Sequence, residues 1–300
     1  MAERDGGHRR PNRGRLAPYG LLAPGIIWLT LFFLVPLASL ARMSLSSKQS
    51  RFDFVPSFSW DWANYSDVFS LYGTQLARSF GFALAATVLC LLIGYPLAYW
   101  VAVHGGRWRN VLIGLVVVPF FTSFLLRTIS WTVLLADNGT VVQAARWAGL
   151  LGVLRAAGLI DGDRLLDTPL AVIGGLTYNF LPFMILPIYV SLEKIDLRLL
   201  DAAADLYASG TSTLRRVVFP LSLPGVFAGS LLTFIPASGD FVNAAFLGGT
   251  RSRMIGNVVQ DRFLVQLDYP GAAAISLLLM AIITSAVLLY AKLLGTAELA

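Results

Sequence analysis

Six long apolar stretches constrain the fold of this chain more than any other feature. They run at about 20–41, 79–103, 110–135, 169–192, 219–246 and 270–294. Each is close to the roughly 20 residues that a helix needs to cross the hydrocarbon core of a bilayer. Lipid offers the backbone no hydrogen-bond partners, so a spanning segment of this kind must be helical. The sequence therefore predicts an all-α, polytopic membrane protein whose main domain, residues 20–294, contains six transmembrane helices.

The composition agrees with this class and excludes others. Hydrophobic residues make up 56% of the 300 positions and charged residues only 13%, which is too apolar for a soluble domain. The net charge of +6 does not indicate a nucleic-acid binder, because no basic face is present and charge flanking the membrane accounts for the sign. The single cysteine, Cys90, lies within an apolar run, so neither a disulfide nor a metal site is expected.

The arginine-rich start sets the expected orientation. Residues 1–19 contain five arginines, which predict a cytoplasmic tail: Arg4, Arg9, Arg10, Arg13 and Arg15. Six crossings would return the tail at 295–300 to the same side. The cytoplasmic connections would be those at about 104–109 and 193–218, and the external ones those at about 42–78, 136–168 and 247–269. The first span is longer than the apolar core of a signal peptide, so it is expected to be retained.

Two of the external segments are expected to be ordered. Trp60, Trp62 and Tyr65 suit an interfacial aromatic belt or a short helix lying on the membrane. The connection at 136–168 is long for a structureless loop, and its apolar residues indicate a short helix along the outer surface. Local packing and contact with an external partner both remain open for these two segments.

Two charged residues lie inside the outer parts of predicted spans, where charge is costly and therefore indicates function. They are Arg127 in the third span and Asp240 in the fifth. Proline and small residues around Asp240 predict an interrupted helix that lines a cavity or packs on protein. Asp240 is the candidate ligand of a cationic solute, with Phe234 or Phe241 adding cation–π contact. The alternatives are that Asp240 pairs with Arg127 or caps the broken helix, and Arg127 itself suits a structural or interfacial role.

The connection at 193–218 is more organised than a plain loop needs to be. Within DAAADLYASGTSTLRRVVFPLSLPG, leucines and alanines recur at helical spacing, with Asp201 and Asp205 on an adjoining stripe. Gly210 predicts a helix stop followed by a second helix, which Pro220 joins to the fifth span. Small residues allow close approach of another surface, and charges fix the register of a contact. The pattern predicts a docking element, with an amphipathic helix on the membrane surface as the alternative.

This segment resembles the EAA motif of ABC importer permeases, which reads Glu-Ala-Ala, three residues, Gly, nine residues, Ile-x-Leu-Pro. Here Asp-Ala-Ala occupies 201–203 and Val-x-Phe-Pro occupies 217–220, with conservative changes at three motif positions. Tyr207 stands where the motif has glycine, and it should crowd the turn. In this family the motif forms the coupling helix that inserts into a cleft on the ATP-binding subunit. The resemblance implies an ATPase-coupling set: Asp201, Ala202, Ala203, Asp205, Tyr207, Gly210, Arg215, Arg216 and Pro220.

The resemblance extends along most of the chain. Several fragments resemble those of spermidine/putrescine permeases of the PotB type, and they occur in the same order and spacing. They include NYSDVF, GYPLAYWVA, VPFFTSFLLRT, LPFMILPIYVSLEKID, PASGDFVNAAFLGG and GNVVQDRFL. The chain is similar to a type I ABC importer permease, a multi-pass protein of the cell inner membrane. Such a permease forms half of a translocation pathway that works by alternating access, and the resemblance implies polyamines as the solutes.

The resemblance also implies partners. They are two copies of a PotA-like ATP-binding subunit, a second, PotC-like permease and an external PotD-like solute-binding protein, all assembled in membrane lipid. The chain has no G-x-x-x-x-G-K-[ST] phosphate loop, so ATP and Mg²⁺ are expected on the partner ATPase, with no cofactor and no catalytic residue in this chain. Other solutes, such as phosphonate, sulfate or iron, remain open, as do an ion-coupled secondary transporter and a scaffold or receptor that transports nothing.

Overall fold

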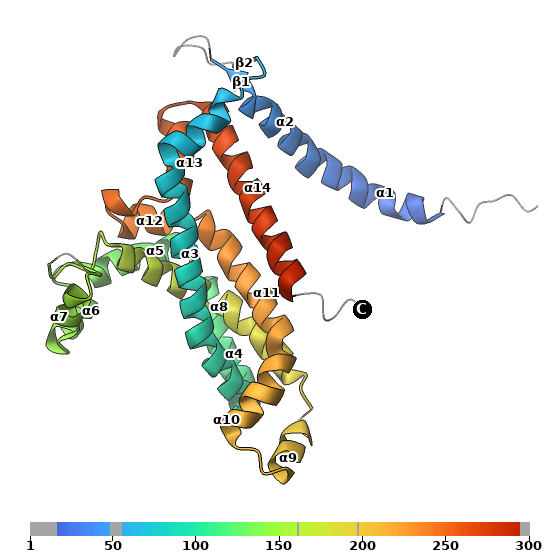
Figure 1. The fold of residues 1–300 in the computed structure, drawn as a ribbon, viewed down its shortest axis with the longest axis vertical. Coiled ribbons are helices and arrows are strands. Elements are labelled where there is room, and N and C mark those ends of the chain that lie inside the picture. The colour runs from blue at the N-terminus through green and yellow to red at the C-terminus, as the bar shows by residue number, and fades with distance from the viewer. Residues whose placement is uncertain (1–16, 49–55, 161, 197, 295–300) are drawn as a thin grey trace, which may run out of the picture.

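The computed structural model describes residues 17–48, 56–160, 162–196 and 198–294, and these residues are mostly helical (Figure 1). The only sheet in these ranges is an antiparallel pair of two-residue strands, β1 (Ser46–Ser47) and β2 (Ser57–Phe58). The predicted all-α fold is therefore confirmed. The predicted tail at 295–300 and most of the one at 1–19 lie outside the described residues.

Five helical rods in the described part of the chain are long and apolar enough to cross a membrane. The first combines α1, a π-helical turn η1 and α2, and the fourth combines α10, a second π-helical turn η4 and α11. Their bounds are α1 Ala17–Leu29, η1 Thr30–Leu34, α2 Val35–Ser44, α3 Ala63–His104, α8 Pro169–Glu193, α10 Gly210–Thr213, η4 Leu214–Val218, α11 Phe219–Ser238 and α14 Tyr269–Leu294.

The sixth candidate span is a bent pair of helices. It is built from η2 (Gly106–Trp108), α4 (Arg109–Val117), η3 (Val118–Phe121) and α5 (Phe124–Leu135). The two halves meet at 91°, because Thr122 and Ser123 take extended backbone angles, with ψ of 147° and 134°, and interrupt the helical hydrogen bonds. The span predicted at 110–135 is therefore sharply bent, and α5 runs across the bundle (Figure 1).

Short helices occupy the remaining connections. They are α6 Thr140–Trp147, α7 Leu150–Ala156, α9 Arg198–Asp205, α12 Val242–Leu247, η5 Thr250–Ser252, α13 Ile255–Gln260 and η6 Asp261–Val265. The helices α6 and α7 form an arm beside the bundle, within the connection for which the sequence predicts a short helix (Figure 1). The helix α9 lies at the opposite end of the molecule from β1 and β2, and this end is called the α9 end below.

The helices α3, α8 and α11 form the packed centre of the molecule. A Cβ atom added at Gly225 would lie 2.6 Å from the carbonyl oxygen of Pro187, and one at Gly229 would lie 3.0 Å from that of Met184. These two glycines therefore let the backbone of α11 approach that of α8, as small residues do between membrane helices. The hydroxyls of Tyr95 and Ser222, 2.9 Å apart, join α3 to α11.

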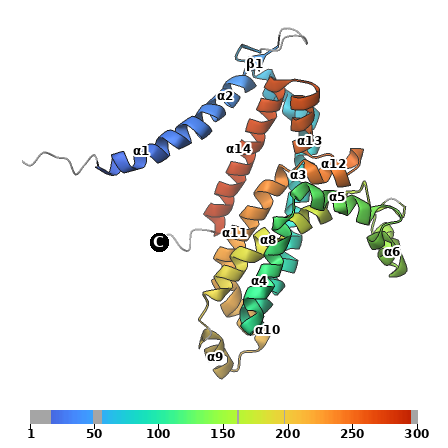
Figure 2. The same cartoon turned by 180° about the vertical axis from the view of Figure 1, so that it is seen from behind.

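The first rod stands apart from this centre (Figure 2). Its α2 end packs against α14, whereas the apolar side chains of α1 and η1 that the structure describes are exposed; Trp28, for example, is 64% exposed. An apolar helix uncovered on this scale requires lipid or another protein chain around it.

Candidate functional site

The segment that resembles the coupling motif lies at the α9 end of the molecule (Figure 1). On α9 itself, Asp201, Ala202 and Asp205 are exposed, whereas Ala203 faces the protein. Within the part of the chain that the structure describes, neither aspartate forms an ion pair. The helix therefore presents two free carboxylates and a small side chain to its surroundings.

The helix α9 ends in a Schellman turn whose left-handed residue is Tyr207. The backbone N–H of Ala208 donates to the carbonyl of Ala203 at 3.0 Å, and that of Tyr207 donates to the carbonyl of Ala204 at 2.9 Å. Tyr207 has φ of 56°, which costs a residue with a Cβ atom roughly 1–2 kcal/mol. Its side chain is 98% exposed, so the expected crowding does not occur. The motif has glycine at this turn, and here tyrosine takes the same left-handed backbone conformation.

The helix stop that the sequence predicts at Gly210 is wrong, because the stop lies three residues earlier. Gly210 is the first residue of α10, and the Ser209 hydroxyl caps this helix by accepting from the N–H of Ser212 at 3.3 Å. The helix then continues through η4 into α11 without a break. What the sequence indicates as a second short helix is the first turn of the long rod.

The π-helical turn η4 carries Arg215 and Arg216, both exposed, and lets the helix pass through Pro220. In a regular α-helix a proline clashes with the carbonyl four residues before it. Here the N–H of Phe219 donates to the carbonyl of Leu214, five residues back, which widens the turn immediately before the proline. The connection to the fifth rod is therefore a continuous helix.

The connection at 193–218 also packs against the centre of the bundle. The side chains of Ile195, Leu200 and Leu214 lie against the buried cluster between α3, α8 and α11. The cluster includes Leu192 of α8 and Val218 of η4, which are buried. Closely packed side chains transmit a displacement rather than absorb it. The packing therefore connects α9 directly to the three central helices.

Asp240 lies at a break between α11 and α12, in agreement with the interrupted helix that the sequence predicts. The residue is 8% exposed. Its Oδ1 accepts from the backbone N–H of Asn243 at 2.7 Å, and its Oδ2 accepts from the side-chain amide of Asn243 at 3.2 Å. Oδ1 therefore caps the first turn of α12, the last of the three alternatives that the sequence leaves open, and Oδ2 holds the Asn243 side chain.

Sequence reasoning missed a buried polar cluster behind this cap. The Asn179 side chain of α8 donates to Oδ1 of Asn243 at 3.0 Å, and the Thr128 hydroxyl of α5 donates to the same atom at 3.4 Å. All three side chains are buried, where polar groups are stable only when hydrogen-bonded, so the cluster holds α5, α8 and α12 together. A signal was present, because Asn179 and Asn243 interrupt apolar runs.

Among the described residues Asp240 forms no ion pair with Arg127, and the other residues of the predicted solute set have contacts of their own. The Arg127 guanidinium lies over the rings of Phe120 and Phe124, 5.5 and 5.8 Å from their centroids. Phe234 packs against the core formed by α8, α12 and their neighbours. Phe241 is half-exposed and lines a separate groove. The structure therefore supports structural roles for Arg127 and Phe234.

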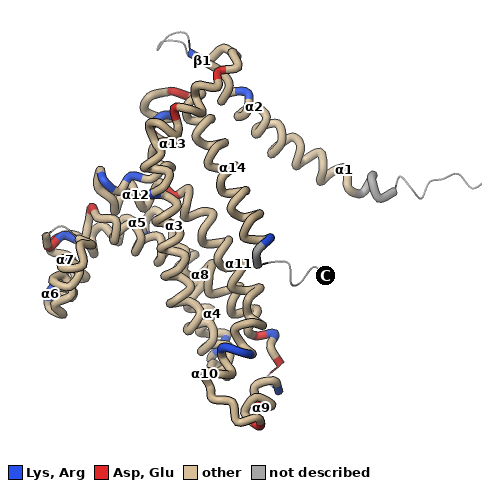
Figure 3. Tube along the Cα trace, viewed as in Figure 1, with Lys and Arg blue, Asp and Glu red and all other residues tan. Residues whose placement is uncertain are grey.

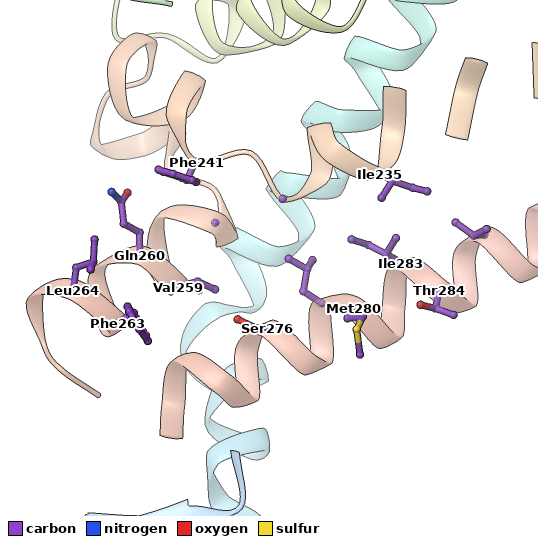
Figure 4. Close-up of a pocket in the computed structure, with 14 residues that line it drawn as sticks. Ile235, Phe241, Val259, Gln260, Phe263, Leu264, Ser276, Met280, Ile283 and Thr284 are labelled. Atoms are coloured by element: carbon purple, nitrogen blue, oxygen red, sulfur yellow. The ribbon is translucent and has the colours of Figure 1, made fainter. Parts of the chain in front are cut away.

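The groove beside Phe241 has a volume of about 710 Å³ and is apolar (Figure 4). It lies between the end of α11, the α13–η6 helix and α14, and its walls include Ile235, Phe263 and Met280. No charged residue lines it, so it offers a cationic solute no counter-charge. Along the described chain, charged residues gather at the α9 end, along the α6–α7 arm, beside α12 and around α13 (Figure 3).

Known proteins resemble this chain in sequence and in fold. Residues 91–294 match a family described as binding-protein-dependent transport system inner membrane component. The chain is 36% identical over 264 residues to the spermidine/putrescine transport system permease protein PotB of Escherichia coli (strain K12), covering 88% of this chain and 92% of that protein. It is 38% identical over 265 residues to PotB of Haemophilus influenzae, covering 88% and 89%. A solved bacterial ABC transporter involved in alginate import has a TM-score of 0.68 at 18% identity, covering 95% of this chain and 97% of that one.

Proposed function

This chain belongs to the family of binding-protein-dependent transport system inner membrane components, and we propose that it is the permease subunit of an ATP-driven importer of spermidine and putrescine. The assignment of the substrate class rests on one observation. The chain is 36–38% identical to two spermidine/putrescine permeases along 88% of its length. The alginate transporter is 18% identical, so its likeness supports the fold and not the solute.

The coupling step takes place at the α9 end. ATP binding closes a dimer of ATPase subunits and displaces α9. The contacts with the ATPase are Ala202 and Asp205 of α9 and Arg216 of η4; Ala203, which the sequence also predicts as a contact, is buried against the protein and is left out. The packed cluster below α9 and the continuous helix through Pro220 support this role, because they join the segment to α3, α8 and α11. The helices then alternate between inward-facing and outward-facing arrangements, biased by the nucleotide state of the partner.

The proposal assigns the other parts of the transporter to separate polypeptides. Two PotA-like subunits bind ATP and Mg²⁺, a PotC-like permease supplies the second half of the pathway, and a PotD-like protein delivers solute from outside. The uncovered apolar rod of α1, η1 and α2 supports a second membrane subunit beside this one. Both termini face the cytoplasm, as the arginines of the tail favour. Asp240 shapes the break before α12 and does not bind solute directly.

Reconstitution of the purified complex in proteoliposomes tests the proposal. Uptake of spermidine and putrescine should require ATP, and Asp201→Lys should lower both transport and the stimulation of ATPase activity while leaving membrane insertion intact. Asp67→Lys is the matched control, because Asp67 is also exposed but lies near the other end of the molecule, at the start of α3. Normal transport by Asp201→Lys would contradict the coupling assignment. Uptake that needs an ion gradient and survives ATP depletion would contradict the ATP-driven class.

A further inference from the structure

The short turn between α3 and α4 is shaped by two glycines and carries an exposed arginine and tryptophan. A Cβ atom added at Gly105 would lie 2.3 Å from the carbonyl oxygen of Val101, so only glycine closes α3 in this way. Gly106 has φ of 44°, in the left-handed region that favours glycine. Arg107 and Trp108, which follow, are both exposed. The turn therefore projects a cation and an aromatic ring from the end of a long apolar helix.

Arg107 is stacked on this ring and has no anionic partner. The carbon of its guanidinium lies 5.6 Å from the centroid of the Trp108 ring. Within the described ranges, the Arg107 side chain forms no ion pair and no hydrogen bond. Stacking occupies the face of a guanidinium and leaves the N–H groups at its edge free to bind two oxygens of one anion.

The charges beside the turn keep this place basic. Arg109 is paired with Glu193, the last residue of α8, so these two charges cancel. Lys194 is exposed and forms no ion pair with any residue that the structure describes. Asp196, the next carboxylate along the chain, accepts from the backbone N–H of Arg198 at 3.0 Å. Basic segments lie between α4 and α10 at this end of the bundle, and the anion that fits here comes from outside the described chain (Figure 3).

An apolar stripe on α4 indicates what kind of anion this is. Trp108, Val111 and Leu115 are 57, 51 and 62% exposed, and their spacing places them on one face of the helix. The stripe therefore begins at the ring on which Arg107 is stacked and continues along the bent span. A soluble anion or an acidic protein surface would need only the cation. A phospholipid would use both parts, because it joins a phosphate to apolar chains.

The depth of the turn agrees with a lipid. The helix α3 is apolar and long enough to cross a membrane, and it ends at His104, three residues before Arg107. The turn therefore lies where a membrane surface begins. Tryptophan is enriched at this depth, and arginine binds a phosphate with two N–H groups at once.

We propose that the α3–α4 turn binds an anionic phospholipid. The phosphate lies against the edge of the Arg107 guanidinium, Lys194 adds to the positive potential, and an acyl chain follows the stripe of Trp108, Val111 and Leu115. This inference goes beyond the proposed function, because it requires only that α3 ends at a membrane surface. It depends neither on the solute nor on the ATPase.

Native mass spectrometry of the purified transport complex tests the proposal. The complex would be titrated with phosphatidylglycerol, which is anionic, or with phosphatidylcholine of the same acyl chains, and the bound lipids counted. Arg107→Gln should weaken the binding of phosphatidylglycerol about fivefold, the share of one arginine near a membrane surface. Arg107→Lys keeps the charge without the fork of N–H groups and should weaken it by a smaller factor. Arg155→Gln is the matched control: it also removes one positive charge, but Arg155 is paired with Asp163, so binding should not change.

Thermal unfolding of the same complexes separates a lipid from a soluble anion. Phosphatidylglycerol should raise the midpoint of the wild-type complex and of Arg155→Gln by more than that of Arg107→Gln. Inorganic phosphate at the same concentration should raise none of them. An equal rise with inorganic phosphate would overturn the lipid site, since it would show that the acyl chains contribute nothing.

Two further outcomes would also overturn the lipid site. One is equal binding of phosphatidylglycerol by the wild-type complex and Arg107→Gln. The other is unchanged lipid binding by Arg107→Gln with weaker binding of the ATPase subunit, which would assign the turn to that subunit. A complex that binds the lipid as expected but shows no ATP-dependent polyamine uptake would contradict the proposed function and leave the lipid site standing.

Discussion

Asp240 and Asn243 form a closed pair at the start of α12. Oδ1 of Asp240 accepts the backbone N–H of Asn243 at 2.7 Å, and Oδ2 accepts its side-chain amide at 3.2 Å. The side-chain oxygen of Asn243 accepts in turn from Asn179 of α8. Asp240 is therefore the outer member of a buried chain of hydrogen bonds, and this chain makes the break between α11 and α12 a fixed corner.

Replacing Asp240 with alanine should lower the free energy of unfolding by about 1–3 kcal/mol, because two donors of Asn243 lose their buried acceptors. Asp240→Asn keeps one carbonyl oxygen for the backbone N–H and should cost about 1 kcal/mol. Thermal unfolding of the purified complex measures both changes, and polyamine uptake should fall only as far as the amount of folded protein falls. A fully stable Asp240→Asn variant without uptake would show instead that the negative charge contacts the solute.

Gly225 should not tolerate a methyl group. An added Cβ would lie 2.6 Å from the backbone oxygen of Pro187 and 2.9 Å from the Cα of Ile188, and the backbone of α8 cannot move aside locally. Gly225→Ala should therefore destabilise the protein by about 1–3 kcal/mol, seen as a lower thermal midpoint in detergent. Gly174→Ala in α8 is the control, since nothing lies within 4 Å of its Cβ position. That variant should be neutral or up to about 1 kcal/mol more stable. Equal melting of the two variants would contradict the close approach of α8 and α11.

Features that depend on local properties could be predicted from the sequence. The predicted span at 169–192 and the helix α8 at Pro169–Glu193 nearly coincide, because Pro169 suits a first helical turn and the Thr168 hydroxyl caps it by accepting from Ala171 at 3.2 Å. The helix α9 likewise lies where leucines and alanines recur at helical spacing, whereas its role in coupling stays a prediction.

Features that depend on contacts between distant segments could not be predicted. The 91° bend at Thr122 and Ser123 falls within an unbroken apolar run. The hydropathy of this run is the same as that of a straight span, so it gives no sign of the bend. The cluster of Thr128, Asn179 and Asn243 joins residues 51 and 64 positions apart. The helix stop is predicted at Gly210 because glycine is the usual left-handed residue, whereas the turn lies at Tyr207, the position that the motif gives to glycine.

The ion pair between Arg109 and Glu193 should contribute modestly to stability. It joins the first residue of α4 to the last residue of α8, next to the coupling segment, and both side chains are partly exposed. Solvent screening limits such a pair to about 0.2–1 kcal/mol. Arg109→Glu and Glu193→Arg should each lower stability and ATPase stimulation, and the double exchange should restore most of both. A double-mutant cycle measures this coupling, and an exchange that restores nothing would show that the pair has no role.

Thiol labelling should show which side of the membrane each end of the bundle faces. Cys90 is the only cysteine and is fully buried, so the unmodified chain should react little with a membrane-impermeant maleimide. Ser66 near the start of α3 and His104 at its end are both exposed, and they lie 38 positions apart on one continuous helix, which is long enough to cross the bilayer. Because the arginines of the tail favour a cytoplasmic start, Ser66→Cys should be labelled in intact cells or spheroplasts, and His104→Cys only after the membrane is opened. The reverse pattern would invert the orientation and would place the coupling segment on the side that lacks ATP.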